Sequence, residues 1–182
     1  LTTNNKKHYI KIKKIIAHGI DKSPQKKFWH RVATLPGHNF RLPNHLAALG
    51  NSQLKKLNNF NSKRRLVAKK YNKFFLKYTN IFEIQKLTKF FTHSYQMYSV
   101  LVNAKKRNSL LYYLKENGVD ASVHFDPPLH KQKYLKKFTT KLINTDKLAK
   151  EILTLPIYPE LSNANMAFIL KRIEKWVKLN NS

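Results

Sequence analysis

The sequence predicts a mixed α/β chain in which one long helix leads into a small α+β domain. An apolar stripe recurs at helical spacing from Leu46 to Phe75, which indicates a single long helix. The residues that follow alternate between strand-like and helix-like segments, the pattern of a small α+β layer. Apolar residues make up 42% of the 182 residues and aromatic residues 12%, so the chain can bury a sizeable core.

The first half contains two predicted helices separated by a loop. A helix that ends before Gly19 is predicted by four apolar residues at helical spacing: Tyr9, Ile12, Ile15 and Ile16. Residues 20–37 form a polar loop with two prolines and the aromatic pair of "KFWH". The long helix should begin near Pro43 or Asn44, because proline suits the first turn of a helix.

The second half is predicted to alternate strands with helices. Strands are expected over 94–102, 119–125 and 153–159, and helices over 104–118, 130–138, 145–153 and 165–179. Three residues should cap helices: Gly118 ends the first of them, Thr145 begins the third and Ser162 begins the last.

The net charge is +27, from 36 Lys and Arg against 9 Asp and Glu. Such a charge points to nucleic acid or an anionic membrane surface. The lysines are spread along the whole chain and accompany many Asn, Ile, Tyr and Phe residues, so a biased composition explains the charge at least as well. There are no cysteines, which excludes disulfides and thiolate chemistry, and no apolar run is long enough to cross a bilayer.

The common signatures of autonomous enzymes are missing from the sequence. The histidine spacings do not predict a metal site, and acidic residues are scarce. Four glycines in total cannot form a phosphate-binding loop or a dinucleotide fingerprint, and no serine lies in a nucleophile elbow. The search for a site therefore rests on segments that are hard to explain as core or as solvated surface.

The first such segment is Leu35–Leu54, which contains no lysine. Gly37 supplies a turn, and Asn39 and Arg41 point to the same side if the segment is extended. Together they suit a phosphate or a carboxylate. The alternative is an Asn that makes local turn bonds and an Arg in a surface ion pair, and spacing alone slightly favours this alternative.

The second segment, "SVHFDPPLH", places His124, Asp126 and His130 around a stiff corner made by two prolines. A stiff polar corner is suited to ligand contact. The alternative is an ordinary turn with partly buried histidines. A third segment, "LPIYPEL", is again a rigid turn with an aromatic residue, and alone it is better explained as a strand end.

Taken together and in order, six stretches of the chain resemble the C-terminal half of the DegT/DnrJ/StrS-type sugar aminotransferases. These stretches are "AHGI", "FWHRVATLPGHNFRL", "AALGNSQL", "HSYQMYSVLV", "GVDASVHFDPPLH" and "LPIYPEL". The resemblance runs from about Thr3 to the end, and "FWH" and "RLPN" are most similar to the branch that makes perosamine-like amino-deoxysugars. The sequence departs from the family pattern at His38, where an aromatic residue is usual, and at Ala17.

The resemblance implies an α/β fold of the pyridoxal-phosphate-dependent transferases, fold type I. Residues 1–60 would be the end of the large cofactor-binding domain and the start of the long helix, and residues 61–182 the small α+β domain. The lysine that forms the Schiff base in this family lies upstream of the stretch matching "TTNNKK", so no catalytic residue is assigned. The aspartate that pairs with the pyridine nitrogen and most phosphate-binding residues also lie upstream in the family, so the resemblance implies a fragment that is inactive alone.

The resemblance also implies roles for four residues. Asn39 matches the Asn that reaches the cofactor phosphate of the partner subunit in a homodimer, and Arg41 lies in the same loop. His124 and His130 match positions near the sugar-nucleotide pocket, where substrate contact is expected. No metal site is expected.

The activity implied is transfer of an amino group from an amino acid, usually glutamate, to a nucleotide-linked keto-sugar. It would serve cell-surface polysaccharide synthesis, such as lipopolysaccharide O-antigen, in the cytoplasm, without a membrane or nucleic-acid partner. Two alternatives remain at this point: a basic nucleic-acid-binding protein, and a non-catalytic paralogue of the aminotransferase scaffold. The first predicts affinity for nucleic acid that falls steeply with salt.

Overall fold

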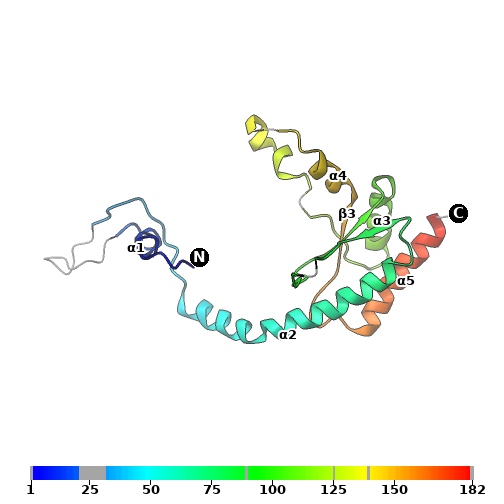
Figure 1. Cartoon of the computed structure of the whole chain (residues 1–182), viewed down its shortest axis with the longest axis horizontal. Coiled ribbons are helices and arrows are strands. Elements are labelled where there is room, and N and C mark those ends of the chain that lie inside the picture. The colour runs from blue at the N-terminus through cyan, green and yellow to red at the C-terminus, as the bar shows by residue number, and fades with distance from the viewer. Residues whose placement is uncertain (1, 21–31, 89, 125, 139, 181–182) are drawn as a thin grey trace. The chain divides into compact units, whose positions relative to one another are not determined.

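The computed structural model describes residues 2–20, 32–88, 90–124, 126–138 and 140–180 (Figure 1). The predicted "KFWH" pair lies outside these residues. The chain divides into two compact units, residues 1–55 and 56–182. The assignment of these units to the large and small domains of an aminotransferase stays a prediction.

The helices and strands follow one another along the chain in this order: α1 (Lys6–Ile15), α2 (Asn44–Phe75), β1 (Phe82–Ile84), β2 (Tyr98–Val102), α3 (Ala104–Glu116), η1 (Leu129–Lys131), η2 (Lys133–Phe138), α4 (Ile143–Glu151), β3 (Ile152–Leu155) and α5 (Asn163–Asn180).

Helix α1 is the helix predicted before Gly19. The side chain of Asn5 caps it by accepting hydrogen bonds from the N–H groups of Lys7 and His8, at 2.9 and 3.2 Å. No residue of α1 is buried, and Tyr9 is 52% exposed. Ile12 and Ile15 are half-buried, so the described residues of the first unit cover the apolar side of α1 only in part.

Helix α2 begins at Asn44, directly after Pro43, as the sequence predicts. Its apolar stripe repeats at eleven-residue intervals, at Leu46, Leu57 and Ala68, a period that keeps the stripe on nearly one side of the helix. Leu46 is 46% exposed and Leu57 is 43% exposed, whereas Ala68 is fully buried. The same stripe is thus part of the core of the second unit at one end and exposed at the other.

The second unit is built on a three-stranded antiparallel sheet with the order β1-β2-β3. Strand β2 pairs with β1 in the register Phe82 to Val102 and with β3 in the register Tyr98 to Leu155. Along β2, Tyr98, Val100 and Val102 are buried while the residues between them are half-buried, the alternation expected of a pleated strand.

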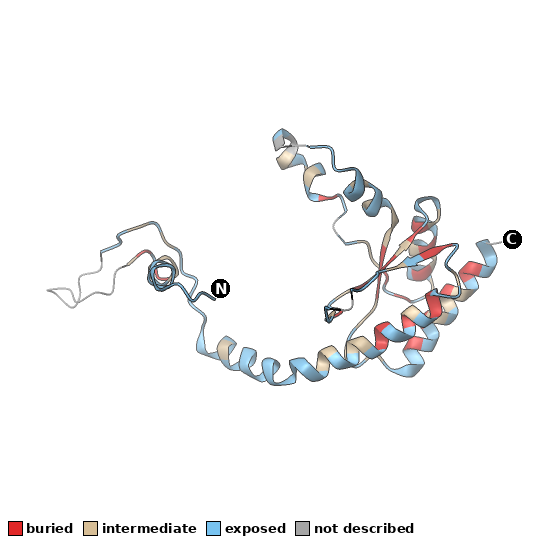
Figure 2. Cartoon of the chain, in the orientation of Figure 1, coloured by how far each residue is buried: buried red, intermediate tan, exposed pale blue. Residues whose placement is uncertain are grey.

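The core lies between the sheet and the apolar sides of α2, α3 and α5, where the buried residues concentrate (Figure 2). Its largest fully buried side chains include Trp176, Tyr71 and Phe75. The indole N–H of Trp176 donates to Ser109 Oγ at 3.2 Å, which satisfies the one polar group that this residue brings into the core.

Several predicted boundaries are wrong. Strand β2 begins at Tyr98, because Tyr95 has a φ of +49°, which is incompatible with an extended strand. Thr145 does not cap α4, which begins at Ile143 without a side-chain cap. The helix predicted over 130–138 is two 3₁₀ segments, and β1 was not predicted. Ser162 does cap α5, with its Oγ accepting from Asn165 N at 3.1 Å.

The strand predicted over 119–125 is reduced to a single bridge between Ser122 and Thr154. Both N–H groups donate across this bridge, at 3.0 and 2.8 Å. The next bonded pairs in an antiparallel ladder would involve Pro156 and Ile152, two residues away on either side. Pro156 has no N–H, and the N–H of Ile152 already donates to Leu148 O at the end of α4. The ladder is therefore blocked in both directions.

The placement of the core predicts that two leucines of the second unit contribute very different amounts to the free energy of unfolding. Leu153 is fully buried in β3, whereas Leu66 on α2 is 62% exposed. We expect Leu153→Ala to lower the free energy of unfolding by about 2–5 kcal/mol and Leu66→Ala by about 0.5 kcal/mol or less. Urea unfolding followed by circular dichroism measures both, and equal losses would contradict this placement of the core.

Candidate functional site

The first candidate site is the loop of residues 37–41, the GHNFR loop, which pairs with the segment that follows α1. Ala17 and Asn39 form an antiparallel bridge. His18 N donates to His38 O at 3.0 Å, and Phe40 N donates to Ile16 O at 3.1 Å. The separate sequence motifs "AHGI" and "GHNFR" thus lie side by side, with "AHGI" forming a turn in which His18 and Gly19 have φ values of +63° and +74°.

Two glycines allow this pairing. A Cβ on Gly37 would lie 2.1 Å from Gly19 N, and a Cβ on Gly19 would lie 1.7 Å from Leu35 O. Gly19 also has a φ of +74°, in the region that favours glycine. The close approach of the two backbones leaves no room for a side chain at either position, which explains the glycine in each motif.

Asn39 and Arg41 are both exposed in the GHNFR loop. The rings of His38 and Phe40 stack with centroids 4.8 Å apart, so these alternate residues share one side of the extended segment. The same alternation gives Asn39 and Arg41 the other side. Neither the local turn bonds nor the surface ion pair of the alternative interpretation is present among the described residues. A free amide and a guanidinium are donors that fit an anion such as a phosphate.

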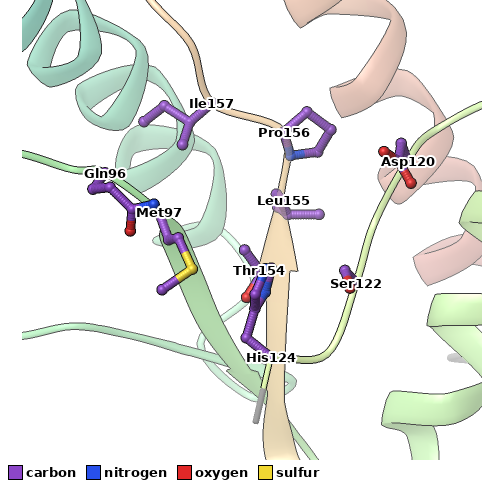
Figure 3. A pocket seen from close by; sticks show the side chains of 9 residues that line it. All are labelled: Gln96, Met97, Asp120, Ser122, His124, Thr154, Leu155, Pro156 and Ile157. Carbon is purple, nitrogen blue, oxygen red and sulfur yellow. The ribbon is translucent and has the colours of Figure 1, made fainter. Parts of the chain in front are cut away.

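The second candidate site is a cavity of about 600 Å³ in the second unit, beside the end of β3. Figure 3 shows Gln96 and Met97 on one side of β3 and Asp120 and Ser122 on the other. The full lining is Gln96, Met97, Asp120, Ser122, His124, Thr154, Leu155, Pro156 and Ile157. His124, which the sequence analysis singled out, is therefore at this cavity and exposed.

The structure places His130 elsewhere. Its side chain is 8% exposed, and its Nε2 lies 3.0 Å from Asp146 Oδ1, while Lys131 Nζ lies 2.6 Å from the same oxygen. The hydrogen bond from Lys131 holds the pKa of Asp146 below its ordinary value, partial burial opposes this, and the bond to His130 adds to the lowering. His130 is not among the residues that line the cavity with His124.

The proline corner between the two histidines is a compact turn. The Asp126–Pro127 peptide bond is cis, and the amide of Gln132 donates to Pro127 O at 2.9 Å. Pro128 is buried, whereas Asp126 is exposed and is not part of the cavity lining. On the two sides of this corner, His130 contacts Asp146 and His124 lines the cavity.

Several residues that line this cavity were not predicted from the sequence, among them Gln96 and Asp120. A second cavity of about 640 Å³ shares Asp120, Pro156 and Ile157 with the first and extends to Tyr158 and Phe168. The "LPIYPEL" stretch therefore borders both cavities, although alone it was explained as a strand end. Its two prolines were the available signal, since they favour a fixed backbone conformation. Gln96 and Asp120 have no comparable signal.

The family model of the DegT/DnrJ/EryC1/StrS aminotransferases matches residues 1–174, so the chain belongs to this family. It is 28% identical over 177 residues to GDP-perosamine synthase of Escherichia coli O157:H7, covering 97% of this chain and 46% of that protein. It is 30% identical over 173 residues to UDP-4-amino-4,6-dideoxy-N-acetyl-beta-L-altrosamine transaminase of Campylobacter jejuni, covering 93% of this chain and 45% of that protein.

Solved structures agree with the family and the fold. Helicobacter pylori PseC, an aminotransferase involved in the biosynthesis of pseudoaminic acid, has a TM-score of 0.83 at 26% identity, over 97% of this chain and 48% of that one. The aminotransferase TlmJ of Streptoalloteichus hindustanus has a TM-score of 0.88 at 21% identity, over 98% and 47%. The α/β fold of these aminotransferases is thereby confirmed. The chain spans about half the length of the relatives it matches.

Among the residues that the structure describes, no helix is long and apolar enough to cross a bilayer. No group of three or more His, Asp or Glu side chains among them is placed to hold a metal ion.

The close glycine contact in the first unit predicts different effects for two Gly→Ala changes. In Gly37→Ala the new Cβ would overlap Gly19 N, so we expect a loss of about 1–3 kcal/mol in local stability and faster hydrogen exchange at the amides of His18 and Phe40. In Gly50→Ala the Cβ meets no atom within 4 Å, and the helix should gain about 0.5–1 kcal/mol. Amide exchange by NMR compares them, and an unchanged rate in Gly37→Ala would exclude the contact.

The contact between Lys131 and Asp146 predicts how the pKa of the Asp146 carboxyl group responds to substitution. The folded-state pKa of Asp146 is below the ordinary 3.8, so this interaction stabilises the fold above that pH and its contribution is lost as the pH falls through the lowered pKa. We expect Lys131→Met to raise the pKa of Asp146, while Lys133→Met, which removes an equal charge two residues away, leaves it nearly unchanged. Carbon NMR of the carboxyl group reports the pKa, and equal shifts in both variants would contradict the pairing.

Proposed function

We propose that this chain is the C-terminal part of a pyridoxal-phosphate-dependent aminotransferase that moves an amino group from glutamate to a nucleotide-linked keto-sugar. The product would serve cell-surface polysaccharides such as the lipopolysaccharide O-antigen, and the enzyme would act as a cytoplasmic homodimer. The single observation that carries this proposal is the family match over residues 1–174. The names of the two relatives above, a perosamine synthase and an altrosamine transaminase, support a sugar substrate.

The GHNFR loop would serve the cofactor of the partner subunit. When bound, pyridoxal phosphate supplies the electron sink for amino-group transfer. Asn39 would donate its amide N–H to the phosphate, and Arg41 would contribute positive charge. Both side chains are exposed and have no partner within the described residues, which supports a role toward a group outside this chain. The stacked rings of His38 and Phe40, on the other side of the segment, would fix the direction in which Asn39 points.

The cavity beside β3 would take part of the nucleotide sugar. Gln96 and Ser122 offer an amide and a hydroxyl group suited to a hydroxylated ligand, and His124 would contact the substrate rather than transfer a proton. His130 would also contact the substrate, with its imidazole ring held by the hydrogen bond to Asp146. A positive field would speed the approach of an anionic nucleotide sugar, although most of the +27 charge is explained by composition.

The Schiff-base lysine would come from sequence upstream of residue 1, and the 182-residue chain alone would be inactive. The non-catalytic paralogue differs from this proposal at that one point. The experiment that separates them assays the natural full-length polypeptide with glutamate, pyridoxal phosphate and a nucleotide-linked 4-keto-sugar, and measures 2-oxoglutarate. Absence of turnover with a folded protein, or of a lysine upstream in the coding sequence, would refute the aminotransferase proposal for this gene.

The role of Asn39 predicts a loss of cofactor affinity in that full-length protein. Because Asn39 would donate a hydrogen bond to a charged phosphate, Asn39→Ala should weaken pyridoxal phosphate binding about tenfold or more. The visible absorbance of the cofactor that remains after dialysis measures this. Asn51→Ala, which truncates an exposed Asn on α2, is the matched control and should retain the cofactor. Equal retention in both variants would remove the role proposed for Asn39.

A further inference from the structure

We propose that Lys70 and Tyr71 of α2 are positioning residues that hold the two ends of the segment Pro156–Asn163, which we call the wall segment. This segment borders both cavities of the second unit, since Pro156 and Ile157 line the two of them. The inference rests on the proposed function in one respect, that the cavity beside β3 takes a nucleotide sugar.

Tyr71 holds the first end of the wall segment. Its side chain is fully buried, and its hydroxyl donates to Pro156 O at 2.9 Å. Its ring stacks on that of Tyr98 with centroids 4.6 Å apart, so the hydroxyl has little freedom to move. Because Pro156 ends the ladder of β3, this hydrogen bond continues the fixed geometry of the strand into the segment that follows it.

Lys70, the residue before Tyr71, holds the other end. Its Nζ donates to Oδ1 of Asn163, the first residue of α5. Between the two ends, Leu161 N donates to Tyr158 O at 3.2 Å, which closes a turn inside the segment. Two adjacent residues of one long helix therefore fix a loop whose ends are seven positions apart in the sequence.

A wall held in this way is ordered before any ligand arrives. Ordering a loop on binding costs free energy, so a preformed wall gives tighter binding than a loose one. Tyr71 and Lys70 do not line either cavity, which means that they act through the wall segment and not by contact with a ligand. Removing the Tyr71 hydroxyl should therefore loosen the wall and weaken binding without deleting a ligand contact.

The test compares Tyr71→Phe with Tyr98→Phe in the full chain. Both changes remove one buried hydroxyl from the same aromatic stack, but the hydroxyl of Tyr98 donates to Asn72 Oδ1, at 2.7 Å, and not to the wall segment. Hydrogen exchange of the Leu161 amide reports on the wall, and that of Leu153 in β3 reports on the core. We expect Tyr71→Phe to speed exchange at Leu161 about fivefold relative to Leu153, the factor for one net hydrogen bond.

In Tyr98→Phe the hydrogen-exchange rates of the Leu161 and Leu153 amides should change by the same factor. A change at Leu161 that is the same in both variants overturns the proposal. Lys70→Met, at an exposed position, tests the second end without touching the core, and it should also speed exchange at Leu161 relative to Leu153. If Tyr71→Phe fails to fold, the result with Lys70→Met decides.

A binding measurement tests the consequence for the site. UDP-N-acetylglucosamine and GDP-mannose serve as probes, and the imidazole signals of His124 are followed during titration. We expect the dissociation constant of a binding probe to rise about fivefold in Tyr71→Phe and to stay unchanged in Tyr98→Phe. Equal affinities in both variants would refute a positioning role. No response to either probe in the unmodified chain counts against the proposed substrate site, and the exchange experiment then decides the wall segment by itself.

Discussion

The hydrogen bonding of β3 is the constraint on which the second unit depends. One side of this four-residue strand pairs with β2, and the other side has a single bonded residue, Thr154, because Pro156 lacks an N–H and Ile152 donates to α4. The segment that carries His124 therefore touches the sheet at one point and then separates from it. The cavity lies where this segment separates from β3. The geometry of the candidate site therefore follows from Pro156 and from the C-terminal end of α4.

In the first unit, the corresponding constraint is the approach of two backbones at Gly19 and Gly37. It holds the start of the GHNFR loop through backbone contact, and the stacked rings of His38 and Phe40 add to this within the loop. A fixed backbone leaves the side chains of Asn39 and Arg41 exposed and available. An exposed polar loop whose backbone is held at both glycines is the kind of segment on which binding residues are found.

The sequence predicted the long, periodic elements well. Helices α1, α2, α3 and α5 were all expected, because their apolar spacing extends over several turns. The bridge at Ser122 could not be predicted, since it depends on where the N–H of Ile152 points. In the candidate site, the motifs singled out Asn39 and His124; of these, His124 lines the cavity beside β3, and the role of Asn39 stays a prediction. Tyr71 was assigned only to the stripe of α2, because a buried tyrosine in a core gives no sign in the sequence of the carbonyl that its hydroxyl meets.

The apolar stripe of α2 has a consequence for how copies of the chain behave at different ionic strengths. Leu46, Leu49, Leu54 and Leu57 are each at least 43% exposed, and such surfaces favour self-association. A net charge of +27 opposes it, because like-charged molecules repel each other over about one Debye length. At low salt this repulsion acts over tens of ångströms, whereas at about 1 M salt the Debye length falls to roughly 3 Å and the repulsion is screened. The colloidal state of the chain is thus set by a balance between one row of leucines and the surrounding electrolyte.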